Sequence, residues 1–112
     1  MLPIKNRLTK KDDFQIIHKK GSFFSNKEFS LLHVKNGLDV SRFGIIVSKK
    51  TFAKATDRNR IRRIVREILR TKLAQIKTGF NVVMHVKTQK IASTKEIEAV
   101  IEQLLKNSFL LK

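Results

Sequence analysis

The feature that most constrains this chain is a basic amphipathic stretch in its middle, from Thr56 to Leu73. A helix turns by about 100° per residue, so its apolar residues would share one side and its arginines would lie opposite. The apolar positions are Ile61, Ile64, Val65, Ile68 and Leu69, and the opposing cations are Arg62, Arg63, Arg66 and Arg70. The stretch therefore predicts a helix with one face in a protein core, and Thr56 or Asp57 could cap its first turn.

The charges along this helix are strongly unbalanced. Glu67 is the only acidic residue after Asp57, in a stretch that also holds Arg58, Arg60 and Lys72. A helix that is polar only for solubility gains ion pairs by alternating charge signs, whereas arginines that recur every four residues repel one another. The pattern favours an anionic partner over a merely solvated surface.

The whole chain shares this excess of positive charge. Its 112 residues include 25 Lys and Arg against 9 Asp and Glu, which gives a net charge of +16. Such a surplus destabilises the compact state by self-repulsion and is typical of proteins that bind nucleic acid. An anionic membrane is the weaker alternative, because the longest apolar run, residues 43–47, is too short to span a bilayer. The length fits a single nucleic-acid-binding domain over 1–112, and the lack of cysteine fits a cytoplasmic protein.

The N-terminal part predicts an arm followed by a short helix. Residues 1–7 are basic and contain Pro3, which favours an extended arm. Thr9 and Asp12 have the spacing of a capping box, and the apolar spacing that follows predicts a helix that ends before Gly21.

Two strands are expected next, and they are expected to form a hairpin. Residues 21–26 have the composition of a turn that leads into a strand over 29–34. Asn36-Gly37 is a dipeptide that favours a tight hairpin turn, and β-branched residues mark the returning strand over 40–47.

A further strand and a further helix follow the basic helix. The nearly continuous apolar run at 80–86 predicts an interior strand, which would pair in parallel with the strand at 40–47. Ser93 and Glu96 form a capping box before a helix expected over 94–109. The predicted fold class is α+β, an α/β sandwich with one mixed sheet of about four strands, a short N-terminal helix, the basic crossover helix and a C-terminal helix.

No set of residues in the sequence has the spacing of a catalytic or metal site. The histidines, His18, His33 and His85, lie far apart and lack a metal-ligand spacing. Asp12 and Asp13 are adjacent carboxylates, but both fall in the first turn of a helix, where they favour the helix dipole. We expect His85 to be packed or to line a cleft, and His33 to be half exposed on an edge strand. No catalytic or metal-ligating residue is therefore expected in the protein itself.

The spaced arginines belong to a longer motif. The motif is Ala55-x-x-Arg58-Asn59-Arg60-x-Arg62-Arg63-x-x-Arg66-Glu67, preceded by Val47-Ser48-Lys49-Lys50. Other matching segments are Arg7-Leu8, Asp13-Phe14 with Gly21, and Arg42-Phe43-Gly44. Together these residues resemble the signature of the bacterial ribonuclease P protein subunit, and the resemblance covers essentially the whole chain.

The resemblance implies a particular fold, and it implies that an RNA rather than the protein carries out catalysis. It implies an α/β sandwich in which the basic helix makes a left-handed strand-helix-strand crossover, against the usual right-handed preference. It also implies that the catalyst is a large RNA, which uses magnesium ions to remove the 5′ leader of precursor transfer RNA. The partners of the protein would then be this catalytic RNA and the precursor. The oligomeric state and direct metal binding by the protein stay open.

The resemblance further implies two binding surfaces. The first would bind the catalytic RNA and comprises Lys49, Lys50, Arg58, Asn59, Arg60, Arg62, Arg63, Arg66 and Arg70. The second would be a cleft for the single-stranded leader, lined by Phe14, His18, Leu32 and Ser48. Arginine offers phosphate a planar fork of donors, and an aromatic ring gives a base a surface on which to stack. This chain departs from the family's pattern at His18, where the family commonly has an aromatic residue, and at Leu32, the position closest to a tyrosine that the family often has.

Two other functions would share the basic helix. A ribosome-associated or general RNA-binding module would use the same arginines but would need no cleft. A DNA reader would place the helix in a major groove, although the sequence shows no second helix and tight turn immediately before Arg58.

Overall fold

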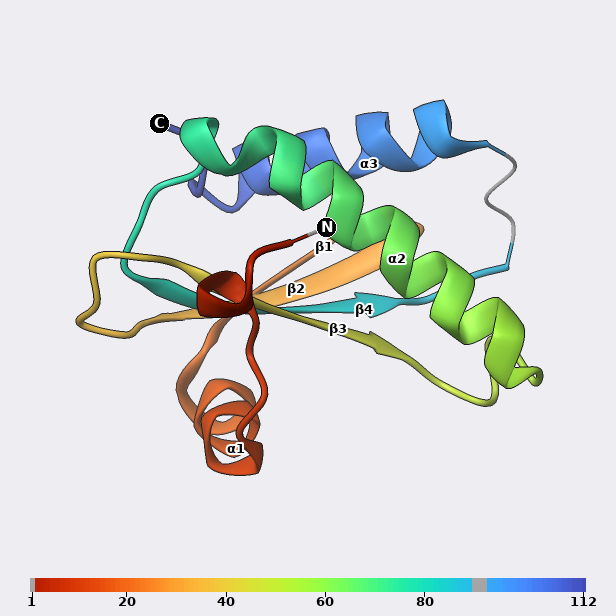
Figure 1. Cartoon of the computed structure of the whole chain (residues 1–112), viewed down its shortest axis with the longest axis horizontal. Helices are drawn as coiled ribbons and strands as arrows, with labels where there is room; N and C mark the ends of the chain where they lie inside the picture. The colour runs from red at the N-terminus through yellow and green to blue at the C-terminus, as the bar shows by residue number, and fades with distance from the viewer. Residues whose placement is uncertain (1, 90–92) are drawn as a thin grey trace.

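The computed structural model describes residues 2–89 and 93–112, which form helices around one mixed sheet (Figure 1). The elements are α1 (Lys11–Lys20), β1 (Ser22–Ser25), β2 (Phe29–Lys35), β3 (Arg42–Val47), α2 (Ala55–Lys72), β4 (Phe80–Val86) and α3 (Thr94–Asn107), with short 3₁₀ helices at Ile4–Asn6 and Leu73–Gln75. The strands lie in the order β1-β2-β4-β3. α1 covers one face of the sheet, whereas α2 and α3 cover the other (Figure 1). The predicted α+β class is confirmed.

The basic helix α2 connects two parallel neighbours, β3 and β4. β4 also pairs antiparallel with β2, so it is the interior strand that its apolar run predicted. In Figure 1 both parallel strands run from left to right below α2, and β3 is the nearer of the two, so the crossover is left-handed. This handedness, which the family resemblance implied, departs from the usual right-handed connection.

The larger core lies between the sheet and the two long helices. Every second residue of β4, namely Val82, Met84 and Val86, is buried in this core, as the alternation of side chains along a strand requires. The helices contribute Val65, Ile68 and Leu69 from α2, and Ile97, Ile101, Leu104 and Leu105 from α3. The apolar stripe predicted for the basic stretch is therefore confirmed.

A smaller core lies between α1 and the opposite face of the sheet. Leu8 and Ile17 are buried there against Val83, and Phe14 packs beside them. Gly44 makes this packing possible, because a Cβ atom at this residue would lie 2.6 Å from Cε1 of the Phe14 ring. β3 thus has a glycine at the point where α1 approaches it most closely.

Two expectations about the sheet are wrong. Residues 22–25, expected in a turn, form the edge strand β1, which pairs with β2. β2 and β3 do not form a hairpin, because β4 lies between them. The Asn36-Gly37 turn is present, with Gly37 at a φ of +72°, but the chain after it crosses to the far side of β4. The dipeptide specifies a local turn, whereas packing over long sequence distances selects the partner of each strand.

The N-terminal arm is not simply extended. Met1 lies outside the described residues, and Leu2 is fully buried in the larger core. Residues Ile4–Asn6 form a 3₁₀ helix, and Arg7 then makes a parallel bridge to Phe43 of β3. Burial of an apolar side chain so near the terminus holds the segment against the sheet.

Among the described helices, α3 alone has the side-chain cap that was expected. The N-cap positions of α1 and α2 are Lys10 and Lys54, and neither makes a side-chain cap bond. At α3, Ser93 Oγ accepts the backbone N–H of Glu96 at 3.2 Å, as the capping box predicted. This helix ends at Asn107, slightly earlier than expected. The residues that were expected to cap and do not are Thr9, Thr56 and Asp57.

We expect Gly44→Ala to lower the free energy of unfolding by about 1–3 kcal/mol, the usual cost of overpacking, because the new methyl group would overlap the Phe14 ring. Chemical denaturation of both proteins measures this difference. A smaller side chain in Phe14→Leu should relieve the overlap, so the double variant should lose less stability than the sum of the single variants. Strict additivity would show that the ring and the glycine are not in contact.

Candidate nucleic-acid interface

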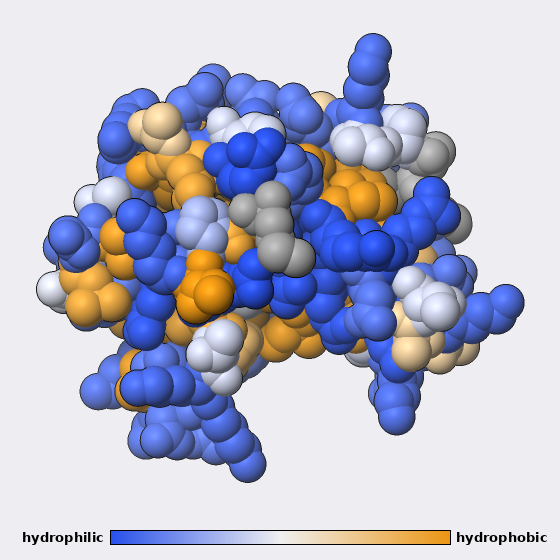
Figure 2. Space-filling view, in the orientation of Figure 1, coloured by the Kyte–Doolittle hydropathy of each residue, from blue (hydrophilic) through white to orange (hydrophobic). Residues whose placement is uncertain are grey.

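The outward side of α2 carries a cluster of cationic side chains. Arg63 is exposed, and Arg62 and Arg66 are half-buried. Asn59 Oδ1 accepts a hydrogen bond from Nη1 of Arg62 at 3.0 Å, which holds that guanidinium against the helix. Hydrophilic side chains predominate in this part of the molecule in Figure 2, with smaller hydrophobic patches between them. The side is free for binding because the opposite side of the helix is occupied by the core.

The arginines are close enough to disfavour one another electrostatically. Partial burial lowers the pKa of Arg66, and the positive charges of Arg7 and Arg62 lower this pKa further. Arginine nevertheless stays protonated at neutral pH. A bound phosphate would relieve this charge density and would accept the planar fork of guanidinium donors.

Arg58, which was expected to bind RNA, is engaged within the protein. Its Nη1 donates to the backbone carbonyls of Phe52 and Ala53, both at 2.9 Å, and so ties the preceding loop to the start of α2. Arg58 lies two helical turns before Val65, on the buried side of the helix. The helical period is the signal that could have predicted this structural role.

Arg70 is also paired inside the protein. Its Nε donates to a carboxylate oxygen of Glu67 at 3.0 Å, and hydrogen bonding to Arg70 is the largest of the causes that lower the pKa of Glu67 to about 2. Both groups are exposed, so the pair adds little stability. Its effect is to reduce the net charge at the end of the arginine surface.

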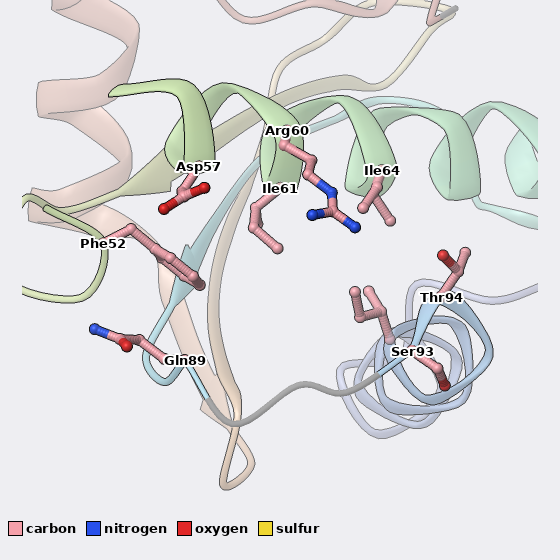
Figure 3. Close-up of a pocket in the computed structure, with 9 residues that line it drawn as sticks. Phe52, Asp57, Arg60, Ile61, Ile64, Gln89, Ser93 and Thr94 are labelled. Atoms are coloured by element: carbon pink, nitrogen blue, oxygen red, sulfur yellow. The ribbon is translucent and has the colours of Figure 1, made fainter. Parts of the chain in front are cut away.

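Arg60 occupies a different flank of α2. A hollow of about 360 Å³ lies between the first half of α2 and the start of α3. Figure 3 shows the Arg60 side chain directed into this hollow, toward Thr94 and the N-cap residue Ser93 at the start of α3. A neighbouring hollow is lined by Arg60, Arg63 and Glu98 of α3. Arg60 and Arg63 therefore face the groove between the two helices.

A second surface lies beside α1, where β3 and β4 end. A cleft of about 470 Å³ is lined by His18, Phe23, Ser30, Leu32, Ile46, Ser48, Thr51, His85, Val86 and Lys87. Of the residues predicted for the leader cleft, His18, Leu32 and Ser48 are thus brought together. Phe14 is not one of the described lining residues, because its half-buried ring packs over Gly44 in the smaller core.

Phe23 gives the cleft an exposed aromatic ring that the sequence-based prediction missed. It lies on edge strand β1 directly opposite Leu32, and it is 64% exposed. Its neighbour Phe24 packs against the larger core and stacks on His33 with ring centroids 5.3 Å apart. Adjacent phenylalanines in a strand place one ring on each face of the sheet. The Phe23-Phe24 pair was therefore the signal for this site.

His18 and His85 meet in the wall of the cleft, with their Nε2 atoms 3.2 Å apart. Nδ1–H of His18 donates to the carbonyl oxygen of Phe14 at 2.7 Å. Burial and the adjacent His18 lower the pKa of His85, which lines the cleft as expected. His33 is on the other face of the sheet, where its Nε2–H donates to the carbonyl of Ser108 at 3.0 Å. The expectation that it lies on an edge strand is wrong, since β2 is interior.

The turn after β3 joins the two surfaces. Ser48 Oγ lies 3.0 Å from Thr51 Oγ1, and both residues line the cleft. Lys49 and Lys50 are exposed between them, and α2 begins soon afterwards at Ala55. The two lysines predicted to bind RNA therefore lie between the cleft and the arginine surface of α2.

Metal clusters and membrane-spanning helices are both absent from the part of the chain that the structure describes. It contains no group of three or more His, Cys, Asp or Glu side chains arranged to hold a metal ion. No helix within 2–89 or 93–112 is both long enough and apolar enough to cross a membrane.

Comparisons with known proteins match nearly the whole chain to one family. Residues 2–108 match the family model described as Ribonuclease P. The ribonuclease P protein component of Thermotoga petrophila is 41% identical over 103 residues, which are 90% of this chain and 87% of that protein. The solved structure of the Thermotoga maritima RNase P protein is 37% identical and covers 90% of this chain and 96% of its own, with a TM-score of 0.83. The Staphylococcus aureus RNase P protein is 31% identical and covers 96% of this chain and 98% of its own, with a TM-score of 0.87. The arginines of α2 and the cleft lie within the matched region, and the chain belongs to the ribonuclease P protein family.

Proposed function

We propose that this chain is the protein subunit of a cytoplasmic ribonuclease P, in which it binds the catalytic RNA and the 5′ leader of precursor transfer RNA and promotes removal of that leader. One observation carries the proposal: the turn at residues 48–51 joins a cationic helix surface to a cleft with an exposed aromatic ring. Two surfaces joined in this way suit a partner that is folded RNA on one side and single-stranded RNA on the other.

The hydrolytic centre of the holoenzyme is proposed to lie in the RNA. The side chains on the outward surface of α2 are mostly guanidinium groups, which stay protonated at neutral pH and do not serve as general bases. Such groups hold phosphates and neutralise their charge. Magnesium ions would stabilise the attacking and leaving oxygens of the phosphodiester, and we propose that the RNA holds them.

The arginine surface suits a folded RNA. The deep groove of an A-form helix hides its base edges, so a protein recognises such an RNA mainly through its backbone and shape. Arg62, Arg63 and Arg66 present forked donors to phosphate oxygens from one helix. Arg58 acts in this surface as a positioning residue, because its donors hold the loop at the start of the helix.

The cleft suits unpaired nucleotides. Single-stranded RNA stacks its bases on aromatic rings, while cationic side chains follow its backbone. Phe23 supplies an exposed ring and Lys87 supplies charge in the same cleft. His18 can also stack on a base, whereas Leu32 offers only apolar contact. Phe14 supports the cleft indirectly, because its packing over the sheet sets the position of α1.

The competing functions fit the structure less well. A general RNA-binding module would need the arginine surface alone, so the adjoining cleft favours the ribonuclease P subunit. A helix-turn-helix DNA reader needs a helix immediately before the recognition helix, whereas the element before α2 is the strand β3.

Added to a bacterial ribonuclease P RNA at low magnesium, the purified protein should restore accurate removal of the 5′ leader, because its cations substitute for part of the magnesium that screens the phosphates. Cleavage of an end-labelled precursor measures this effect, with the RNA alone and the protein alone as controls. A lack of stimulation with a cognate RNA would contradict the proposed function.

Arg63→Ala should weaken binding to the catalytic RNA and reduce the salt dependence of that binding by about one ion, because one phosphate contact is lost. Titrations of labelled RNA at several salt concentrations give the slope. Lys106→Ala removes the same charge from the last turn of α3 and is the matched control. If Arg63→Ala keeps the slope of the unmodified protein, its side chain is solvated surface.

Phe23→Ala should weaken binding of precursor transfer RNA by about 1–3 kcal/mol, the usual loss for one stacked base, and should spare mature transfer RNA. Equilibrium binding of the two RNAs to the holoenzyme measures the difference. Phe14→Ala is the comparison: it should lower the free energy of unfolding by about 2–3 kcal/mol, because it removes a packed ring, whereas Phe23→Ala should hardly change it. Equal binding losses for both RNAs would exclude a stacking role for Phe23.

A further inference from the structure

The contact between His18 and His85 requires a proton between the two ring nitrogens. The two residues belong to different elements, α1 and β4, and their Nε2 atoms approach to 3.2 Å. Because Nδ1–H of His18 donates to the carbonyl of Phe14, Nε2 of a neutral His18 carries a lone pair and can only accept. In the absence of an ion, Nε2 of His85 must therefore carry the proton that lies between the two rings.

We propose that His18 and His85 are ligands of one divalent transition-metal ion of the Zn²⁺ class, which binds both Nε2 atoms while the proton between them moves to Nδ1 of His85, so that both rings stay neutral. Zinc binds histidine nitrogen at about 2.0–2.1 Å in a tetrahedral arrangement, and nitrogens 3.2 Å apart then subtend an angle of about 100° at the metal. The separation of the two Nε2 atoms is thus already that of a pair of zinc ligands.

The surroundings of the His18 ring match those of a histidine ligand. A histidine ligand usually donates its other ring N–H to a carbonyl or a carboxylate, which fixes its tautomer and orientation. His18 makes this hydrogen bond to Phe14 at 2.7 Å. Metal ions bind the neutral imidazole, and burial together with the adjacent His18 lowers the pKa of His85, which favours that form.

The remaining coordination positions of the ion would open into the cleft. The described lining residues near it offer hydroxyl groups rather than carboxylates, such as that of Ser30, which lies directly opposite His85 on β2. Lys87 and the net charge of +16 disfavour a bare cation, so the free protein should bind the ion only moderately. A phosphate oxygen of a bound leader would complete the coordination, and this step alone rests on the proposed function. Metal and RNA would then raise each other's affinity by the same factor.

The test is a titration of the purified full chain with Zn²⁺, followed by NMR signals of the histidine rings. The rings of His18 and His85 should shift together and saturate at one ion per protein. His33 should not shift, because its Nε2–H is donated to Ser108 on the other face of the sheet. The affinity should fall as the pH is lowered, because protons compete for the same nitrogens.

His18→Gln and His85→Gln should each reduce the Zn²⁺ affinity at least about tenfold, a loss that even changes around metal ligands cause. His33→Gln is the matched control and should bind as the unmodified protein does. Amide spectra check the fold of each variant, and His18 is exposed, so its variant remains informative if His85→Gln unfolds.

The ion site is excluded if His18→Gln binds Zn²⁺ undiminished, if His33→Gln loses as much affinity, or if neither cleft histidine shifts at millimolar Zn²⁺. These measurements use the free protein and no RNA. A protein that binds zinc but neither the catalytic RNA nor the leader would contradict the proposed function and leave the ion site standing.

Discussion

The pairing of β4 between β2 and β3 is the constraint on which the rest of the structure depends. Parallel neighbours cannot be joined by a tight turn, so the chain must cross one face of the sheet, and α2 is that crossing. A helix in this position must bury an apolar stripe, but the fold sets few requirements for its other side. The arginines occupy that other side. A surface of concentrated positive charge is thereby held by one of the best-packed elements of the protein, which offsets part of its self-repulsion.

Elements with a long apolar pattern were predictable from the sequence, whereas the pairing of the strands was not. The apolar run of β4 and the apolar stripe of α2 each contain enough positions to identify a buried strand and a helix face. The Asn36-Gly37 turn was equally visible, yet nothing local shows that β4 separates the strands that this turn connects. β1 has only 4 residues, which is too short for a periodic signal, so its residues resembled a turn.

The candidate site was likewise predictable only in part. The resemblance to the family grouped His18, Leu32 and Ser48, and the structure brings these residues into one cleft, although their binding of a leader stays a prediction. Phe14 was expected in that cleft, and its burial depends on Gly44, a contact that spacing along the chain does not reveal. Arg58 was counted among the RNA-binding residues by its motif; its Nη1 also holds the loop before α2, and its binding of RNA stays a prediction.

The short edge strand β1 has one more consequence. Phe23 and Phe24 are adjacent, so a slip of one residue in the register of β1 against β2 would turn both rings over at once. Phe24 would leave its stack on His33, and Phe23 would leave the cleft. The buried ring therefore selects the alignment that displays the exposed ring. Packing of the Phe24 ring in the core thus fixes the register of the edge strand. The same register determines which ring lines the cleft on the opposite face of the sheet.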